Sequence, residues 1–197
     1  MSPRWLFYPS TGQRLIIHDQ FSGSGNLEGR TPDTVDNGNT WDTGGATAWD
    51  VSSGYAYMSS ATYRAMIDPG TTTYRVEWES KTTQARSHGI WFRYDGDSAN
   101  IRSTIFLNSN QTGLQLFERV GSSNVVTTLA TGLSGLINTP LYWTADVDGT
   151  SISYDLSTSS GSVASGTATL QNSLGDVGVY HNDNGTSTQT HDFKVYA

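Results

Sequence analysis

The sequence predicts an all-β protein built as a two-sheet antiparallel β-sandwich. Apolar and polar residues alternate along several short runs, as they do in strands with one buried and one solvated face. Turn-forming Gly, Asn, Asp and Ser residues separate these runs. Strong helix formers are scarce, since lysine occurs only at positions 81 and 194. A length of 197 residues suits one large domain, which we expect to span residues 15–197.

Two central runs show the alternation most clearly. Residues 74–79 read Tyr-Arg-Val-Glu-Trp-Glu, so every second side chain is apolar. Further along, Ile90 and Phe92 are expected to face the core. Trp91 and Arg93 then point away from it. Other strands are expected at residues 15–21, 62–67, 101–107, 114–119, 125–129, 141–147, 151–155, 177–181 and 192–196.

Two segments stand outside this pattern. Residues 23–47 form a long, polar, turn-rich stretch, which we expect to be either a functional excursion or a lid over one end of the sandwich. Residues 1–14 are expected to form an N-terminal arm, which carries Trp5, Phe7 and Tyr8 outside any alternating run. Such an arm either docks on a partner molecule or packs on its own domain.

The composition excludes several classes of function. Eleven basic and 18 acidic residues give a net charge of −7, which argues against a general nucleic-acid-binding surface. The absence of cysteine rules out disulfides, thiolate zinc sites and a cysteine nucleophile. No stretch is apolar enough to insert into a membrane. The first residues lack the apolar run of a secretory signal, so we expect synthesis in the cytoplasm without a signal peptide.

Four stretches together resemble the concanavalin A-like, laminin-G-like jelly-roll superfamily. They are Asp19-Gln-Phe-Ser-Gly-Ser-Gly, Gly89-Ile-Trp-Phe-Arg, Leu141-Tyr-Trp-Thr-Ala-Asp-Val-Asp-Gly and His191-Asp-Phe-Lys-Val-Tyr. The resemblance is one of strand spacing and turn type, and it covers residues 15–197. It implies a jelly-roll sandwich in which the first and last strands lie side by side.

The opening and closing stretches also look like domains of tail and head accessory proteins of tailed bacteriophages. This resemblance implies a non-enzymatic structural protein on the virion surface, used either as capsid cement or decoration, or as a tail-mounted adhesion or tail-fibre protein. The implied partners are other virion proteins and further copies of the same chain, as a homo-oligomer. The arm at residues 1–14 is then a candidate anchor.

An enzyme is the least favoured reading. The resemblance implies that laminarinase-like relatives carry Glu-x-Asp-x-x-Glu on one strand, and none of Glu28, Glu77, Glu79 and Glu118 fits that spacing. Glu77 and Glu79 share a strand face with Arg75, a pattern typical of a solvated surface. No Gly-x-Ser-x-Gly elbow is present either. We therefore expect no catalytic residue, and a glycoside hydrolase or lyase ranks third.

Two groups of polar residues are candidates for metal or proton chemistry. The dipeptides His18-Asp19 and His191-Asp192 would be brought together by pairing of the first and last strands, either as a metal or acid–base pair or as ordinary polar edge residues. Asp95, Asp97 and Asn100 cluster hard oxygens on one loop, as calcium prefers. The alternative for that loop is a turn that bonds its own backbone. No cofactor is required, and Ca²⁺ is the one that the sequence favours.

A glycan site is the last candidate. Sugar sites pair an aromatic face with planar polar groups, and Trp91 with Arg93 on the non-core face of one strand offers both. Tyr142 is expected to add to this patch. A shift of the strand by one residue would instead place Trp91 in the core. The alternative to the virion role is therefore a lectin-like module that recognises a host surface polysaccharide.

Overall fold

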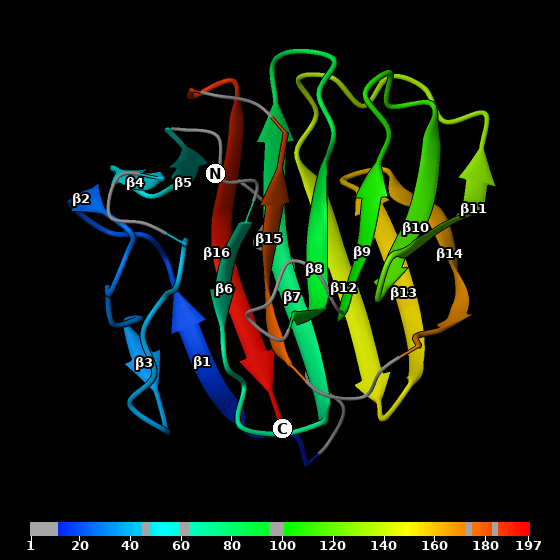
Figure 1. Ribbon diagram of the computed structural model, residues 1–197. Helices are drawn as coiled ribbons and strands as arrows, with labels where there is room; N and C mark the ends of the chain where they lie inside the picture. The colour runs from blue at the N-terminus through cyan, green and yellow to red at the C-terminus, as the bar shows by residue number, and fades with distance from the viewer. Residues whose placement is uncertain (1–11, 45–47, 60–63, 95–100, 172–174, 183–184) are drawn as a thin grey trace.

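The computed structural model describes residues 12–44, 48–59, 64–94, 101–171, 175–182 and 185–197. These residues form strands and turns without a helix, and so contain no helix that could cross a membrane. The strands build one ten-stranded and one six-stranded sheet, both antiparallel, which pack face to face (Figure 1). The predicted all-β sandwich is confirmed.

The ten-stranded sheet contains both ends of the described chain. Its strands run in the order β14-β13-β12-β7-β16-β5-β4-β2, and β1 pairs with both β16 and β3. β1 and β16 are antiparallel, with Asp19 opposite Phe193, so the expected pairing of first and last strands is confirmed. The strands are β1 (Leu15–Asp19), β2 (Ser24–Asn26), β3 (Thr34–Val35), β4 (Trp49–Ser52), β5 (Ala56–Met58), β7 (Thr73–Thr82), β12 (Leu141–Asp148), β13 (Ser151–Thr158), β14 (Gly161–Thr169) and β16 (Thr188–Tyr196).

The six-stranded sheet forms the other layer, in the order β11-β10-β9-β8-β15-β6. Each neighbouring pair is antiparallel, so residues directly opposite one another share a face of the sheet. One face packs on the core and the other points outward. The strands are β6 (Arg64–Ile67), β8 (His88–Tyr94), β9 (Ile101–Leu107), β10 (Gly113–Val120), β11 (Ser123–Thr131) and β15 (Asp176–His181).

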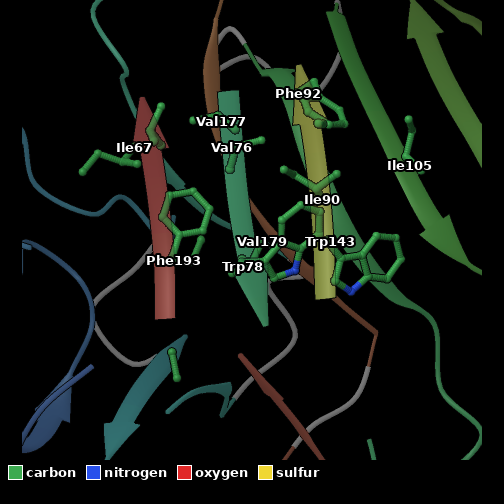
Figure 2. Close-up of a cluster of buried hydrophobic side chains, with 14 of the residues drawn as sticks. Ile67, Val76, Trp78, Ile90, Phe92, Ile105, Trp143, Val177, Val179 and Phe193 are labelled. Carbon is green, nitrogen blue, oxygen red and sulfur yellow. The ribbon is translucent and has the colours of Figure 1, made fainter. Parts of the chain in front are cut away.

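The core lies between the two sheets and is lined by alternate residues of the central strands (Figure 2). Trp78 and Trp143 stack there with ring centroids 5.0 Å apart. Ile90 and Phe92 belong to this core, as predicted. Trp91 lies in a separate cluster on the outer face of its sheet, so the alternative that it fills the sandwich core is wrong.

The turn-rich stretch joins the edges of the two sheets. Within its described part, residues 23–44, Leu27 N–H donates to Trp49 O of β4 in one sheet. Asp42 forms an antiparallel bridge with Met66 of β6 in the other. The stretch therefore closes the lateral edge of the sandwich, because β6 is the edge strand of its sheet. Of the two alternatives for this stretch, the lid over one end is wrong in position, and the functional excursion stays a prediction.

Candidate functional site

The outer face of the six-stranded sheet carries a hollow of about 250 Å³. We call it the aromatic basin, and its lining consists of Trp91, Arg102, Thr104, Phe106, Phe117 and Tyr180. Period-two alternation places these residues outward, while their neighbours Ser103, Ile105 and Leu107 are buried in the other direction. The basin is therefore a property of one sheet face and not of a loop.

Strand register brings the lining residues together from four strands. Thr104 of β9 lies opposite both Trp91 of β8 and Phe117 of β10. In the next row, Phe106 of β9 and Tyr180 of β15 both lie opposite Gly89. Residues that are far apart in sequence thus form two adjacent rows across the sheet.

Glycines on this face let the rings meet. Gly89 has no side chain between Phe106 and Tyr180, and these two rings contact each other edge to face at 5.6 Å between centroids. A Cβ atom at Gly89 would lie only 2.1 Å from the carbonyl oxygen of Ile105. Close backbone approach thus requires glycine at this position, and the absent side chain leaves room for the rings.

The basin combines an aromatic floor with a cation and a hydroxyl. Trp91 is 6% exposed and meets Tyr180 edge to face at 5.6 Å. The Arg102 guanidinium carbon lies 5.7 Å from the Trp91 ring centroid and 5.1 Å from that of Phe117. Thr104 Oγ1 is buried and has no hydrogen-bond partner in the described part of the chain. A buried hydroxyl without a partner is costly, and because this oxygen is closed to solvent a ligand reaches it only when the neighbouring side chains move.

The structure separates the three residues predicted for a glycan site. Trp91 lines the aromatic basin. Arg93 belongs to β8, but its side chain lies outside the described part of the structure. Tyr142 lies on β12 in the other sheet and alternates with the buried Leu141 and Trp143, so it faces outward on the opposite side of the sandwich. The expected grouping of Tyr142 with Trp91 was therefore wrong.

Tyr142 belongs to a polar face on the ten-stranded sheet. It lines a small hollow of about 60 Å³ with Glu77, Glu79 and Lys194. Burial raises the pKa of Glu79, and burial followed by the charge of Glu79 raises the pKa of Tyr142. This face is acidic and crowded, unlike the aromatic basin.

Glu77 is buried rather than solvated, which corrects the expectation for this strand. It is 7% exposed, and Arg75 Nε donates to its Oε1 at 2.6 Å. The same guanidinium reaches Asp146 on the neighbouring strand β12 at 3.2 Å. Arg75 and the Tyr196 hydroxyl, which lies 3.5 Å from Glu77 Oε2, therefore take the place of water as partners of this carboxylate.

Two other glutamates stabilise the fold by accepting hydrogen bonds. Glu28 accepts hydrogen bonds from the Thr43 backbone N–H at 2.6 Å and from the Thr43 hydroxyl at 2.7 Å. Glu118 is buried and accepts from the Ser103 hydroxyl and the Gln171 backbone N–H. Both side chains therefore satisfy local donors, which is a structural role.

The paired His-Asp dipeptides are brought together as expected. His18 Nε2 lies 2.7 Å from Asp192 Oδ1, and Lys194 also contacts the Asp192 carboxylate. His191 Nδ1 instead lies 2.8 Å from Gly54 O. The described residues contain no group of three His, Cys, Asp or Glu side chains that could hold a metal ion. These contacts match the reading as polar edge residues.

Two other sets of predicted residues lie outside the described part of the chain. They are the calcium-loop residues Asp95, Asp97 and Asn100 and the arm residues Trp5, Phe7 and Tyr8. Calcium binding and arm docking therefore stay predictions. Arg14, at the expected end of the arm, exchanges two backbone hydrogen bonds with Ala197 and so extends the pairing of β1 with β16.

The chain matches no family model and no curated protein. Several solved structures share its fold. The GH16 endo-β-1,3(4)-glucanase SCLam superposes with a TM-score of 0.63 at 11% identity, covering 96% of this chain and 93% of that one. The CBM2 module of the evolved Dit protein of Lactobacillus casei BL23 phage J-1 gives 0.53 at 12% identity, covering 93% and 95%.

A third match is only to part of a protein. The GH43 protein BlXynB of Bacillus licheniformis gives a TM-score of 0.60 at 14% identity, covering 91% of this chain but 38% of that one. Identities this low establish the fold alone. The chain is therefore a jelly-roll β-sandwich of the kind found in carbohydrate-binding modules and GH16 enzymes.

Proposed function

We propose that this protein is a carbohydrate-binding module that holds a polysaccharide on the aromatic basin. The observation that carries the proposal is the lining itself: aromatic rings, a guanidinium and a buried hydroxyl converge on one outward hollow. Pyranose rings stack their apolar faces on aromatic side chains, and a few fixed polar groups orient their hydroxyls.

The solved structures that share the fold support this reading by analogy. One is named as a carbohydrate-binding module of a phage protein, and another as a glucanase. A shared fold does not establish a shared activity, so the proposal depends mainly on the residues of the basin.

We propose that the module binds its polysaccharide without hydrolysing it. A glycosidase needs two carboxyl groups that flank the scissile bond. The pair on one strand, Glu77 and Glu79, lies on the opposite face of the sandwich from the basin. Glu77 is already ion-paired with Arg75. The basin lining contains no carboxylate among the described residues.

Affinity electrophoresis through gels that contain single polysaccharides tests the proposal. Phe117→Ala is expected to weaken retention about tenfold, equivalent to about 1.4 kcal/mol, because it removes a stacking surface. Phe117 is half-buried, so its loss disturbs the fold less than that of the buried Trp91. Tyr142→Ala is the matched control, since it removes an aromatic ring from the opposite face.

Melting curves of both variants show whether each is folded before its retention is interpreted. Equal retention of wild type and folded Phe117→Ala, or a larger loss in Tyr142→Ala, would place binding elsewhere. Release of reducing ends from a retained polysaccharide would contradict the non-enzymatic form of the proposal.

A second candidate function is that of a virion component of a tailed bacteriophage. The similarity to the phage J-1 module, which spans nearly the whole of both chains, favours it. In this candidate the chain assembles as a homo-oligomer on capsid or tail and adheres to a host surface polysaccharide. The partners would be other virion proteins.

Deletion of residues 1–11 tests the virion candidate and keeps the pairing of Arg14 with Ala197 intact. The truncated chain is expected to keep its melting temperature and its retention on polysaccharide but to be lost from purified particles. Incorporation equal to that of the full chain would contradict anchoring by the arm. The molecular mass of the full chain in solution tests whether it forms the expected homo-oligomer. A chain that is monomeric both in free solution and on particles would contradict this expectation.

A further inference from the structure

We propose that the aromatic basin selects polysaccharides whose sugars carry a carboxylate group, such as uronic acids. This inference rests on the proposed function and names the class of ligand for the same site. It is carried by the placement of arginines around the aromatic floor.

The basin's sheet is basic although the whole chain is acidic. The chain has a net charge of −7 and only 11 basic residues. Outward-facing arginines nevertheless occur on β6, β9 and β10, as Arg64, Arg102 and Arg119. The acidic residues of the six strands are Glu118, which is buried against Ser103, and Asp176.

Strand register sets these arginines at both sides of the aromatic floor. Arg119 lies directly opposite Arg102 across β9 and β10, so both side chains emerge on the same face. Arg64 lies opposite Tyr180 across β6 and β15, at the other side. Asp176 on that side interacts with Asp68, Asp42 and Arg64, so aspartates offset the charge of Arg64 there, and the basic side of the basin is that of Arg102 and Arg119.

Arg102 is built into the basin rather than placed on its rim. Its guanidinium lies over two rings, at 5.7 Å from the Trp91 centroid and 5.1 Å from the Phe117 centroid. Cation–π contacts of this kind orient the planar group. An oriented guanidinium presents paired N–H donors that match the two oxygens of a carboxylate. A carboxylated sugar can therefore stack on the rings and meet the cation in one pose.

A neutral sugar would use only part of this site. Its apolar face could stack on Phe117 and a hydroxyl could accept a hydrogen bond from Arg102, but it has no pair of charged oxygens to match the paired donors of the guanidinium. Aromatic rings with arginines also suit single-stranded nucleic acid. The net charge of −7 opposes a polymer charged on every unit, such as single-stranded nucleic acid, more strongly than a polysaccharide that carries a carboxylate on only some of its sugars, so we favour the latter.

Affinity electrophoresis with matched probes tests the inference. The acidic probes are alginate, polygalacturonate, hyaluronan and xanthan, and the neutral ones are dextran, mannan, laminarin and xylan. Each retained acidic polymer is also tested after reduction of its carboxyl groups to alcohols, which keeps the backbone. We expect retention by at least one acidic polymer, at least a tenfold loss on reduction, and weakening by added salt.

Variants of the arginines localise the effect. Arg102→Gln is expected to weaken binding to the acidic polymer at least tenfold, and Arg102→Lys to recover only part of it, because lysine keeps the charge but not the paired donors. Arg119→Gln is expected to weaken binding less. Arg14→Gln is the charge-matched control, since Arg14 pairs with Asp36 away from the basin.

The results distinguish a failure of the carboxylate preference from a failure of the glycan site itself. Retention on neutral polymers that depends on Phe117 but not on Arg102 would overturn the carboxylate preference and keep the glycan site. Equal binding of the carboxyl-reduced polymer, or tighter binding of a dT20 oligonucleotide than of any acidic polymer, would also overturn it. Retention on none of the eight polysaccharides would overturn both.

Discussion

Acidification from pH 7 to pH 4 is expected to lower the free energy of unfolding by about 3 kcal/mol through His88 alone. His88 is fully buried, and burial lowers its pKa to about 4. In the unfolded chain a histidine takes up its proton near pH 6.5. Between these two pH values the unfolded state binds more protons than the folded state, so stability falls as the pH falls.

His181 adds to the same effect. It lies opposite His88 across β15 and β8, and burial followed by the charge of His88 lowers its pKa. Its Nε2 lies 2.9 Å from Thr190 Oγ1. Within the described residues, neither His88 Nε2 nor His181 Nδ1 has a hydrogen-bond partner, so neither ring has an acceptor for a second proton.

Urea unfolding at pH 7, 5.5 and 4 measures the effect. His88→Leu is expected to flatten the pH dependence, whatever its stability at pH 7. Asp176 acts in the opposite direction, because burial and the nearby Asp68 and Asp42 raise its pKa to about 6, and it is half-buried so that solvent weakens its contribution. Asp176→Asn is therefore expected to steepen the loss at low pH. An unfolding free energy that stays constant from pH 7 to pH 4 in the wild type would contradict neutral buried histidines.

Replacement of Asp19 by alanine is expected to destabilise the fold by about 3–5 kcal/mol. Asp19 is fully buried at the end of β1. Its carboxylate accepts from the Phe21 backbone N–H at 2.7 Å and from Trp41 Nε1 at 2.9 Å, and Arg30 Nε lies 3.4 Å from Oδ2. The substitution leaves the two buried donors without their acceptor, and it leaves Arg30 with only Asp33, at 3.7 Å, among the ion-pair partners described.

The measurement is the unfolding free energy of Asp19→Ala and of a matched control. Asp36→Ala removes another aspartate that pairs with an arginine near this sheet edge, but its partner Arg14 is exposed. It is expected to cost about 0–1 kcal/mol. Equal effects of the two substitutions would show that the Asp19 carboxylate does not tie residues 23–44 to β1.

Most strands could be predicted from the local pattern of apolar, polar and turn-forming residues. The strand expected at residues 101–107 has the same bounds in the structure, because this run is rich in the β-branched and aromatic residues that favour strands. β14 was missed, since Gly161–Thr169 consists of small and polar residues and carries no alternation of large apolar side chains. As an edge strand it needs little side-chain packing, and pairing with β13 holds it.

The candidate site could be predicted from the sequence only in part, because strand register depends on residues that are far apart in the chain. The phase of residues 90–92 placed Trp91 outward. The sequence does not indicate that Phe117 lies two strands from Trp91, or that Tyr142 lies in the other sheet. The order of the strands in the two sheets determines both placements. Glycines at 89 and 178 were the available signal, because a glycine inside a strand marks close approach of neighbouring chains.

We propose that the aromatic basin, and not the polar face of the other sheet, is the glycan site. The most direct test is an NMR titration of the labelled full chain with an oligosaccharide cut from a retained polysaccharide. We expect saturable shift changes confined to β8, β9, β10 and β15, including the Trp91 indole N–H. Shift changes centred on Glu79 and Tyr142 of the ten-stranded sheet would contradict it.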